Sequence, residues 1–133
     1  NNRVIIISNY LSEEEILELR FATDILINLR KKDQVGAAFL ESLSMQSYVI
    51  TGSWLPYKFL NELGVFFKMI NSPSDLVYAL EEGIMLYKNT VIKEKLKNNM
   101  DIINHKYSLE NTIFQWDKFY EETFALMFNK YKE

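Results

Sequence analysis

Two carboxylates flank a short glycine-containing turn in the first third of the chain. Asp33 precedes the turn, and Glu41 follows eight residues later. Gly36 and the alanines after it, Ala37 and Ala38, would let a ligand approach the backbone closely. If a helix begins here, its free N–H groups and its dipole favour an anion, while carboxylates accept hydrogen bonds from sugar hydroxyls. The stretch therefore suits a ligand that has phosphate and polyol parts, although spacing alone is also compatible with an ordinary loop that carries two surface acids.

The elements that must position this turn alternate along the chain. Short apolar runs predict four strands, at 4–8, 25–29, 48–51 and 65–70. Helical patterns separate them, the first with a capping box of Ser12 and Glu15, and after residue 73 only helices are expected, at 73–87, 89–106 and 109–131. This order predicts a single α/β domain over residues 1–133, a partial Rossmann-like parallel sheet with a helical C-terminal extension. Ligands of such sheets bind beyond the carboxyl ends of the strands, where residues 33–41 would lie.

The composition excludes several classes of function. The chain has 133 residues, of which 48% are hydrophobic, and a net charge of −3, so it can bury a core and does not resemble a nucleic-acid binder. It has no cysteine and only one histidine, His105, which excludes a disulfide framework and a multi-histidine metal centre. The apolar runs are too short to span a bilayer, and the cysteine-free composition suits a reducing compartment such as the cytoplasm.

The ordered set of motifs resembles the C-terminal, donor-binding domain of the large family of retaining glycosyltransferases with the GT-B fold. The family signature is commonly Glu-any-Phe-Gly, three more residues, an apolar residue and then Glu-Ala-Met. At the corresponding places this chain has Asp33, Val35, Gly36, Leu40, Glu41, Ser42 and Leu43. The resemblance continues before the signature, through residues 8–15 and 22–28, and after it, through 49–52, 65–70 and 72–76. It covers roughly residues 3–130 and implies a hexosyltransferase that uses a nucleotide diphosphate sugar.

The resemblance also assigns roles to particular residues. Glu41 matches the glutamate that binds the ribose hydroxyls, and Asp33 matches the catalytic-site acid that contacts the donor sugar near the reacting carbon. The remaining donor-binding positions are backbone segments, namely the turn of Gln34, Val35, Gly36, Ala37 and Ala38 along the sugar and diphosphate, and the loop of Asn9, Tyr10 and Leu11 at the nucleobase. Enzymes of this family need no bound metal or other cofactor, because protein charges and amide dipoles stabilise the leaving diphosphate.

The chain departs from the family pattern in several places. Asp33 is one carbon shorter than the usual glutamate, Gln46 stands where a glycine is usual, and Tyr48 stands where a proline is usual. Two early strands of the family's domain, with their diphosphate-binding Arg/Lys pair, and the whole acceptor-binding N-terminal domain have no counterpart in these residues. Since transfer requires both domains to close, we expect this chain alone to be inactive. The resemblance also allows the full enzyme to associate peripherally with a membrane.

Other residues of interest have simpler interpretations. Residues 30–32 (Arg-Lys-Lys) either attract a diphosphate or are merely solvated, and His105 is expected on the surface. Trp54 and Tyr57 either stack on a sugar ring or pack against a helix. An apolar stripe on the last predicted helix runs from Trp116 to Tyr131, and we expect it to pack in a core or to dock on another domain. Together with exposed sheet edges, the same stripe allows the chain to form a homo-oligomer. The alternative function is a non-catalytic α/β interaction domain that keeps only the scaffold.

Overall fold

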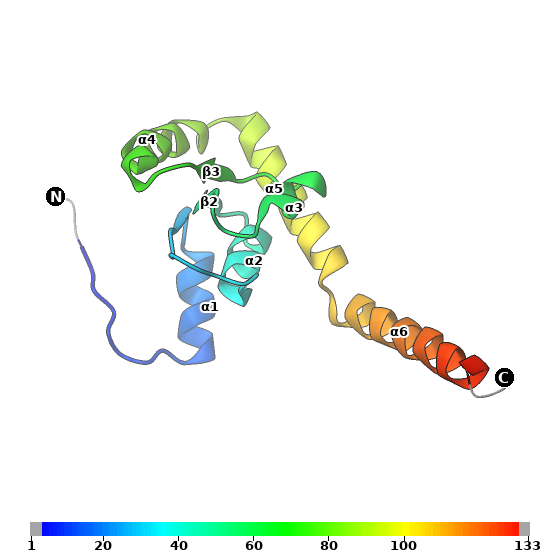
Figure 1. The fold of residues 1–133 in the computed structure, drawn as a ribbon. Helices are drawn as coiled ribbons and strands as arrows, with labels where there is room; N and C mark the ends of the chain where they lie inside the picture. Colours follow the sequence, from blue (N-terminus) through cyan, green and yellow to red (C-terminus); the bar gives the residue numbers. More distant parts are fainter. Residues whose placement is uncertain (1–3, 131–133) are drawn as a thin grey trace.

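A computed structural model describes the backbone of residues 4–130 and the side chains of residues 4–125 and 127. The chain forms an α/β domain with a small parallel sheet (Figure 1). In order, the elements are α1 (Glu13–Phe21), β1 (Ile25–Asn28), α2 (Ala37–Ser44), β2 (Tyr48–Gly52), α3 (Lys58–Glu62), β3 (Lys68–Ile70), the 3-10 helix η1 (Pro73–Asp75), α4 (Leu76–Leu86), α5 (Thr90–Lys106) and α6 (Leu109–Lys130). Within the described residues, no helix is both long enough and apolar enough to cross a membrane.

The sheet has the strand order β1-β2-β3, and both pairings are parallel. All five residues of the central strand β2 are buried, because helices cover both of its faces. Successive side chains of β2 alternate between two apolar clusters: Val49 joins the cluster with α2, α3 and the end of α5, whereas Tyr48 and Ile50 join the cluster with α4 and the start of α5. The sheet is therefore the middle layer of a three-layer domain, as a Rossmann-like arrangement requires.

The prediction of a strand at 4–8 is wrong. Residues 4–8 pair with no strand, and Val4 and Ile6 are more than 80% exposed in an extended segment that passes α1 at a distance from the sheet (Figure 1). A run of β-branched residues favours extended backbone, but a strand is stabilised only by a neighbour that supplies hydrogen bonds and cross-strand contacts. Among the described residues, the sheet consequently has three strands instead of four, and none of them pairs with the outer edge of β1.

The last strand is shorter than predicted because a side chain replaces part of its pairing. Asn99 of α5 is completely buried and binds both backbone groups of Phe66: its Oδ1 accepts from Phe66 N at 2.7 Å, and its Nδ2 donates to Phe66 O at 2.6 Å. These bonds satisfy the backbone before β3 begins at Lys68. They also connect α5 to the sheet.

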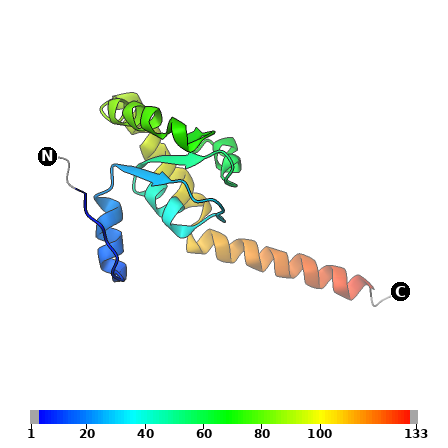
Figure 2. The same ribbon diagram turned by 60° about the vertical axis from the view of Figure 1, so that its left-hand side comes forward.

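The outer helices are less well anchored than the centre. The N-terminus of α1 has the predicted capping box, with Glu15 N bonded to Ser12 Oγ and Ser12 N bonded to Glu15 Oε2, but α1 buries no residue of its own. At the other end, α6 leaves α5 and projects away from the body in both views (Figures 1 and 2). The well-packed part of the molecule is thus the sheet with α2, α3, α4 and α5.

Candidate functional site

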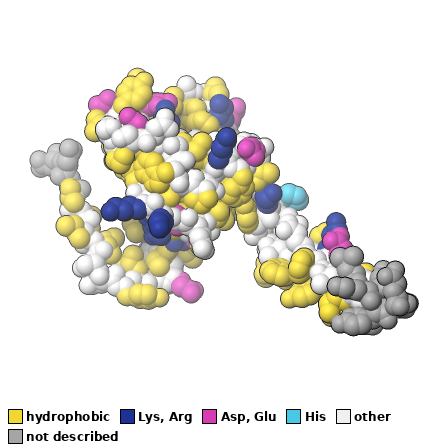
Figure 3. Space-filling model, in the orientation of Figure 1, with side chains coloured by type: hydrophobic (Ala, Val, Ile, Leu, Met, Phe, Trp, Pro, Cys, Tyr) yellow, Lys and Arg dark blue, Asp and Glu magenta, His cyan; other side chains and the backbone are white. Residues whose placement is uncertain are grey.

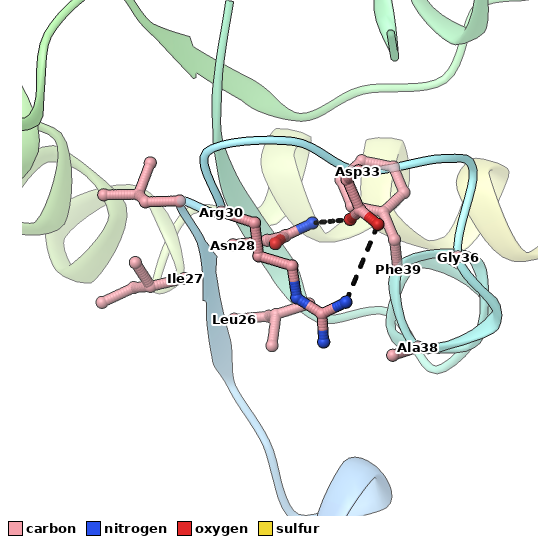
Figure 4. Close-up of a pocket in the computed structure, with 9 residues that line it drawn as sticks. Leu26, Ile27, Asn28, Arg30, Asp33, Gly36, Ala38 and Phe39 are labelled. Atoms are coloured by element: carbon pink, nitrogen blue, oxygen red, sulfur yellow. Dashed lines mark hydrogen bonds and ion pairs between the residues drawn. The ribbon is translucent and has the colours of Figure 1, made fainter. Parts of the chain in front are cut away.

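The candidate site lies where β1 ends, at the loop of residues 29–36 that leads into α2 (Figure 4). Asn28 is the last residue of β1, and its Nδ2 donates to Asp33 Oδ2 at 3.2 Å. The hydroxyl of Tyr57 donates to the same oxygen at 2.5 Å. The second carboxylate oxygen, Oδ1, lies 3.7 Å from Nη1 of Arg30. The loop therefore holds Asp33 in one orientation, with one oxygen bound internally and the other facing a cation at the surface.

The surroundings of Asp33 favour its charged form. The hydrogen bond from Tyr57, followed by that from Asn28, keeps the pKa of the Asp33 carboxyl below its usual value. Burial, together with the bond to Asp33, raises the pKa of Tyr57 to about 12. At neutral pH, Tyr57 thus remains a donor and Asp33 remains an acceptor, which is the state required to bind hydroxyl groups.

Tyr57 connects this carboxylate to the core. Its ring is completely buried and stacks on Phe39 of α2, with centroids 3.8 Å apart and planes within 3° of parallel. Tyr57 therefore packs inside the domain and cannot stack on a sugar ring, one of the two roles considered for it. Phe39 belongs to the first turn of α2, so one stacked pair positions both Asp33 and the start of that helix.

Asp33 borders a hollow of about 380 Å³ along the open edge of β1. Its polar wall consists of Asn28, Arg30 and Asp33, and the rest is formed by β1 and the start of α2 (Leu26, Ile27, Leu29, Gly36, Ala38, Phe39). A few converging polar groups on a largely apolar wall are typical of small-molecule sites. The hollow lies at the carboxyl end of a parallel strand, as predicted for ligands of this fold class.

The first turn of α2 adds unoccupied backbone donors. Gly36 is the N-cap, with extended backbone (φ −79°, ψ 145°), and no side chain caps the helix. The amides of Phe39 and Leu40 bond to Gly36 O, at 3.1 and 3.3 Å, whereas those of Ala37 and Ala38 belong to the orphan donors of a helix start. Both alanines are exposed, so the amides at this end can face an anionic group.

Glu41 lies one turn further along α2, beside a different hollow. Its carboxylate forms an ion pair with Arg20 of α1 and is partly exposed. The second hollow, of about 480 Å³, lies between α2 and the junction of α5 with α6, and it is lined by Ala37, Leu40, Glu41, Ser44, Ile103, Asn104, Tyr107 and Ser108. Asp33 and Glu41 thus border separate hollows, and the start of α2 contributes Ala38 to the first hollow and Ala37 to the second.

The remaining predicted site residues lie outside both linings. Gln34 and Val35 are exposed in the turn, and the carbonyl of Gln34 accepts from Tyr57 Oη at 3.3 Å. Asn9, Tyr10 and Leu11 lie in the segment before α1, where Tyr10 is almost fully exposed, and they line neither hollow. The structure therefore brings Asp33 together with the turn but does not bring the 9–11 loop to either hollow.

The basic cluster and Trp54 meet at the edge of the site. Arg30 is largely exposed and lines the first hollow, while its carbonyl accepts from Trp54 Nε1 at 2.9 Å. The indole of Trp54 lies over Gly52 so closely that a Cβ at position 52 would be 2.3 Å from its Cε2 atom. Trp54 thus braces the loop that carries Arg30, which means that its hydrogen bond to the Arg30 carbonyl holds this loop against β2. His105 is exposed in the last turn of α5, as predicted, and the part of the chain that the structure covers contains no group of three or more potential metal ligands.

Sequence reasoning missed three residues that shape these sites. Asn28 and Tyr57 bind Asp33, and Arg20 pairs with Glu41. Only Asn28 had a usable signal, because a polar residue at the end of an apolar strand lies at the edge where ligands bind. The other two contacts join segments more than twenty residues apart, so no local sequence pattern predicts them.

Comparison of the chain with family models, with curated proteins and with solved structures finds no match. The structure itself defines a small α/β protein with a three-stranded parallel sheet. Its candidate site is a hollow at the carboxyl end of β1 that combines a charged acid, a cation and free helix amides.

Proposed function

We propose that this chain is the donor-binding part of a retaining glycosyltransferase of the GT-B type, which transfers a hexose from a nucleotide diphosphate sugar. The observation that carries the proposal is the position of Asp33, held ionised at the rim of a hollow and next to the uncapped start of α2. The family resemblance of residues 33–41 supplies the reaction type. The geometry supplies acceptors for sugar hydroxyls and donors for a diphosphate within one loop.

Asp33 would orient the donor sugar. Its Oδ1 faces the surface beside Arg30, and a carboxylate oxygen can accept more than one hydrogen bond. Hydroxyl groups in the first hollow can therefore bind Asp33 without displacing Tyr57 or Asn28 from Oδ2. Because these two donors fix the carboxylate in advance, sugar binding requires little reorganisation.

The diphosphate would lie across the first turn of α2. The amides of Ala37 and Ala38 supply donors, the helix dipole favours negative charge, and Arg30 supplies an exposed cation from the neighbouring loop. Since Ala38 lines the first hollow and Ala37 the second, a ligand that crosses this turn extends from Asp33 towards Glu41. The two carboxylates would then bind the two ends of one extended donor.

Glu41 would receive the ribose in the second hollow. Its present partner is Arg20, so the ribose hydroxyls either share the carboxylate with that guanidinium or displace it. The ion pair is partly exposed, and such pairs contribute only about 0–1 kcal/mol, so its displacement is a small cost. Ser44, Asn104 and Ser108 add hydrogen-bonding groups to the same hollow.

The open edge of β1 agrees with the domain that the resemblance implies. In the sheet of that domain, the two early strands without a counterpart here lie side by side between the counterpart of residues 4–8 and the counterpart of β1. The segment 4–8 is outside the sheet here, and no strand from residues 4–130 pairs with the outer side of β1. We therefore expect donor binding to be weak in these residues alone, and transfer to require the acceptor-binding domain.

Titration calorimetry of the chain with a panel of nucleoside diphosphates and their hexose conjugates tests the proposal. We expect heat from at least one conjugate, with weaker binding in Asp33→Asn and in Glu41→Gln. Glu62→Gln, at an exposed position of α3, is the matched control and should bind like the unchanged chain. Binding that is identical in all four proteins would contradict the assigned roles of Asp33 and Glu41.

The second candidate is a non-catalytic α/β interaction domain. One observation favours it: both acids already have partners inside the chain, Asp33 in Tyr57 and Asn28, and Glu41 in Arg20. These contacts stabilise a scaffold whether or not a ligand binds. If no conjugate in the panel produces heat, with the acceptor-binding domain also present, the interaction domain is the better description.

A further inference from the structure

The helix α6 presents an apolar face that the rest of the described chain does not cover. The helix projects from the end of α5 (Figure 2), and hydrophobic side chains are visible on its described part in the space-filling view (Figure 3). The apolar residues of this face recur three or four residues apart, and each is more than half exposed (Leu109, Ile113, Trp116, Tyr120, Phe124, Met127). Tyr131, the last member of the predicted stripe, lies outside the described residues.

A helix in this position requires a partner. Isolated helices are marginally stable in water, and most helices in proteins are stabilised by packing of an apolar face. The charged residues Lys118, Glu121 and Glu122 lie on the other side of α6, at 100° per residue, and Lys118 and Glu122 form an ion pair there. The helix is therefore amphipathic: its charged residues gather on one side, where Phe114 is also exposed, and the continuous apolar stripe lies on the other.

A socket that has the geometry of helix pairing lies at the edge of the apolar face and shares Trp116 with it. Four residues, Thr112, Gln115, Trp116 and Phe119, line a hollow of about 360 Å³ on α6 alone. Their spacing is i, i+3, i+4 and i+7, which is the four-residue hole that receives one side chain of a facing helix in knobs-into-holes packing. The aromatic side chains beside the hole have the size of such knobs. One helix therefore carries both a hole and the side chains that can insert into the hole of a second copy.

The aromatic side chains of this face supply a large part of the area that a dimer needs. Trp116, Phe119, Tyr120 and Phe124 are 53–58% exposed. Aromatic side chains bury roughly 150–250 Å² each, so these four offer on the order of 400 Å². That is about half of the roughly 800 Å² that each partner contributes to a standard interface, before Leu109, Ile113 and Met127 are counted.

We infer that α6 pairs with α6 of a second copy of this chain, in a symmetric helix–helix interface along the face of Trp116 and Phe119. A self-complementary face produces an isologous contact, which is the commonest form of protein dimer. The body of each copy does not obstruct the pairing, because α6 extends clear of it in both views. This inference is independent of the proposed function, since it uses no residue of the two hollows near α2.

Sedimentation equilibrium of the full chain tests the inference first. We expect a reversible monomer–dimer equilibrium. The double variant Trp116→Ser/Tyr120→Ser should weaken dimerisation by roughly 30-fold or more, because buried tryptophan and tyrosine residues are the usual hot spots of an interface. The matched control, Lys118→Ser/Glu122→Ser, changes two residues with the same spacing on the opposite side without altering net charge, and it should dimerise normally.

Cross-linking provides a second test that does not depend on weakening the helix. The chain has no cysteine, so introduced thiols report on chosen positions alone. Thr112→Cys/Thr123→Cys places two thiols on the proposed face, and Phe114→Cys/Ala125→Cys places two with the same spacing on the opposite side. We expect disulfide-linked dimers from the first pair and monomers from the second.

A chain that stays monomeric at all soluble concentrations while α6 is helical by circular dichroism would overturn the inference. That result would assign the apolar face to a partner other than a second copy, such as another domain or a different polypeptide. Equally fast cross-linking from both cysteine pairs would also overturn it, because it would show random collision instead of a defined face.

Discussion

Tyr57 donates a hydrogen bond of 2.5 Å to Oδ2 of Asp33, and this bond joins the apolar core to the candidate site. The tyrosine ring is stacked on Phe39 at the start of α2, so one stacked pair connects the acid and the helix start to the core. Pre-organisation of this kind makes a carboxylate an effective acceptor, because its orientation is fixed before a ligand arrives. This bond is the main cause of the lowered pKa of Asp33, and it adds to burial in raising the pKa of Tyr57.

The first prediction concerns the substitution Tyr57→Phe. It removes the hydroxyl but keeps the ring, so the pKa of Asp33 should rise towards its usual value as the largest cause of its depression is lost. Carboxyl resonances followed by NMR during a pH titration measure this shift. Tyr78→Phe, at an exposed position of α4, is the control, and it should leave Asp33 unchanged. An unchanged Asp33 in Tyr57→Phe would show that the bond does not form in solution.

The second prediction is a dependence of stability on pH. The pKa of Asp33 is lower in the folded chain than the usual value of 3.8. Its contribution to stability is therefore complete above that value and is lost as the pH falls through the folded pKa. Urea unfolding between neutral pH and about pH 3 should show a shallower acid loss of unfolding free energy in Asp33→Asn than in the unchanged chain. Identical slopes would mean that Asp33 is equally easy to protonate in both states.

The third prediction concerns the contact of Trp54 with Gly52. In Gly52→Ala, the new Cβ would meet the indole at 2.3 Å, so the ring must move and its bond to the carbonyl of Arg30 should break. We expect a loss of about 1–3 kcal/mol in unfolding free energy, as for other overpacked sites, and a shifted indole N–H resonance of Trp54. Gly36→Ala, whose Cβ would have no neighbour closer than 3.7 Å, is the control for the indole resonance and should leave it unshifted. If both variants behave alike, Trp54 does not brace the loop.

The fourth prediction concerns Asn99. Replacement by alanine leaves the N–H and C=O of Phe66 without their side-chain partner, which should cost roughly 2–4 kcal/mol of unfolding free energy. Urea denaturation measures the change. Asn98→Ala, at the exposed neighbouring position, should remain within about 0.5 kcal/mol of the unchanged chain. A small effect at both positions would show that water replaces the Asn99 side chain.

The fifth prediction concerns the ion pair between Arg20 and Glu41. Arg20→Met should change the unfolding free energy by only about 0–1 kcal/mol, because the pair is partly exposed. The amides of α1 should nevertheless exchange faster with deuterium, since α1 buries no residue and loses a contact with α2. Glu18→Gln, exposed on the same helix, is the control for hydrogen exchange by mass spectrometry. Unchanged protection of α1 would show that other contacts hold it in place.

Local patterns predicted the elements that are stabilised locally or lie at the centre of the sheet. The capping box at Ser12 marks the start of α1, and the apolar runs at 25–29 and 48–51 are strands because they neighbour each other. Gly36 is at the start of α2, as its place in the signature indicates. These features depend on a few adjacent residues, which is why one sequence reveals them.

Patterns failed where a distant partner decides the outcome. Residues 4–8 have the composition of a strand but no strand beside them, and residues 65–67 lie outside β3 because Asn99 binds Phe66 from α5. The same limit applies to the site. The turn at Gly36 was predictable, but the anchoring of Asp33 by Tyr57 was not, because the two are 24 residues apart.

The unpaired side of β1 has a consequence for any measurement on this site. Because Leu26, Ile27 and Asn28 form one wall of the first hollow, a polypeptide that adds a strand beside β1 also changes the depth and polarity of that hollow. Ligand affinity and strand addition are therefore thermodynamically linked, and each alters the other by the same factor. A polypeptide that added to the sheet at this edge would therefore also regulate the site.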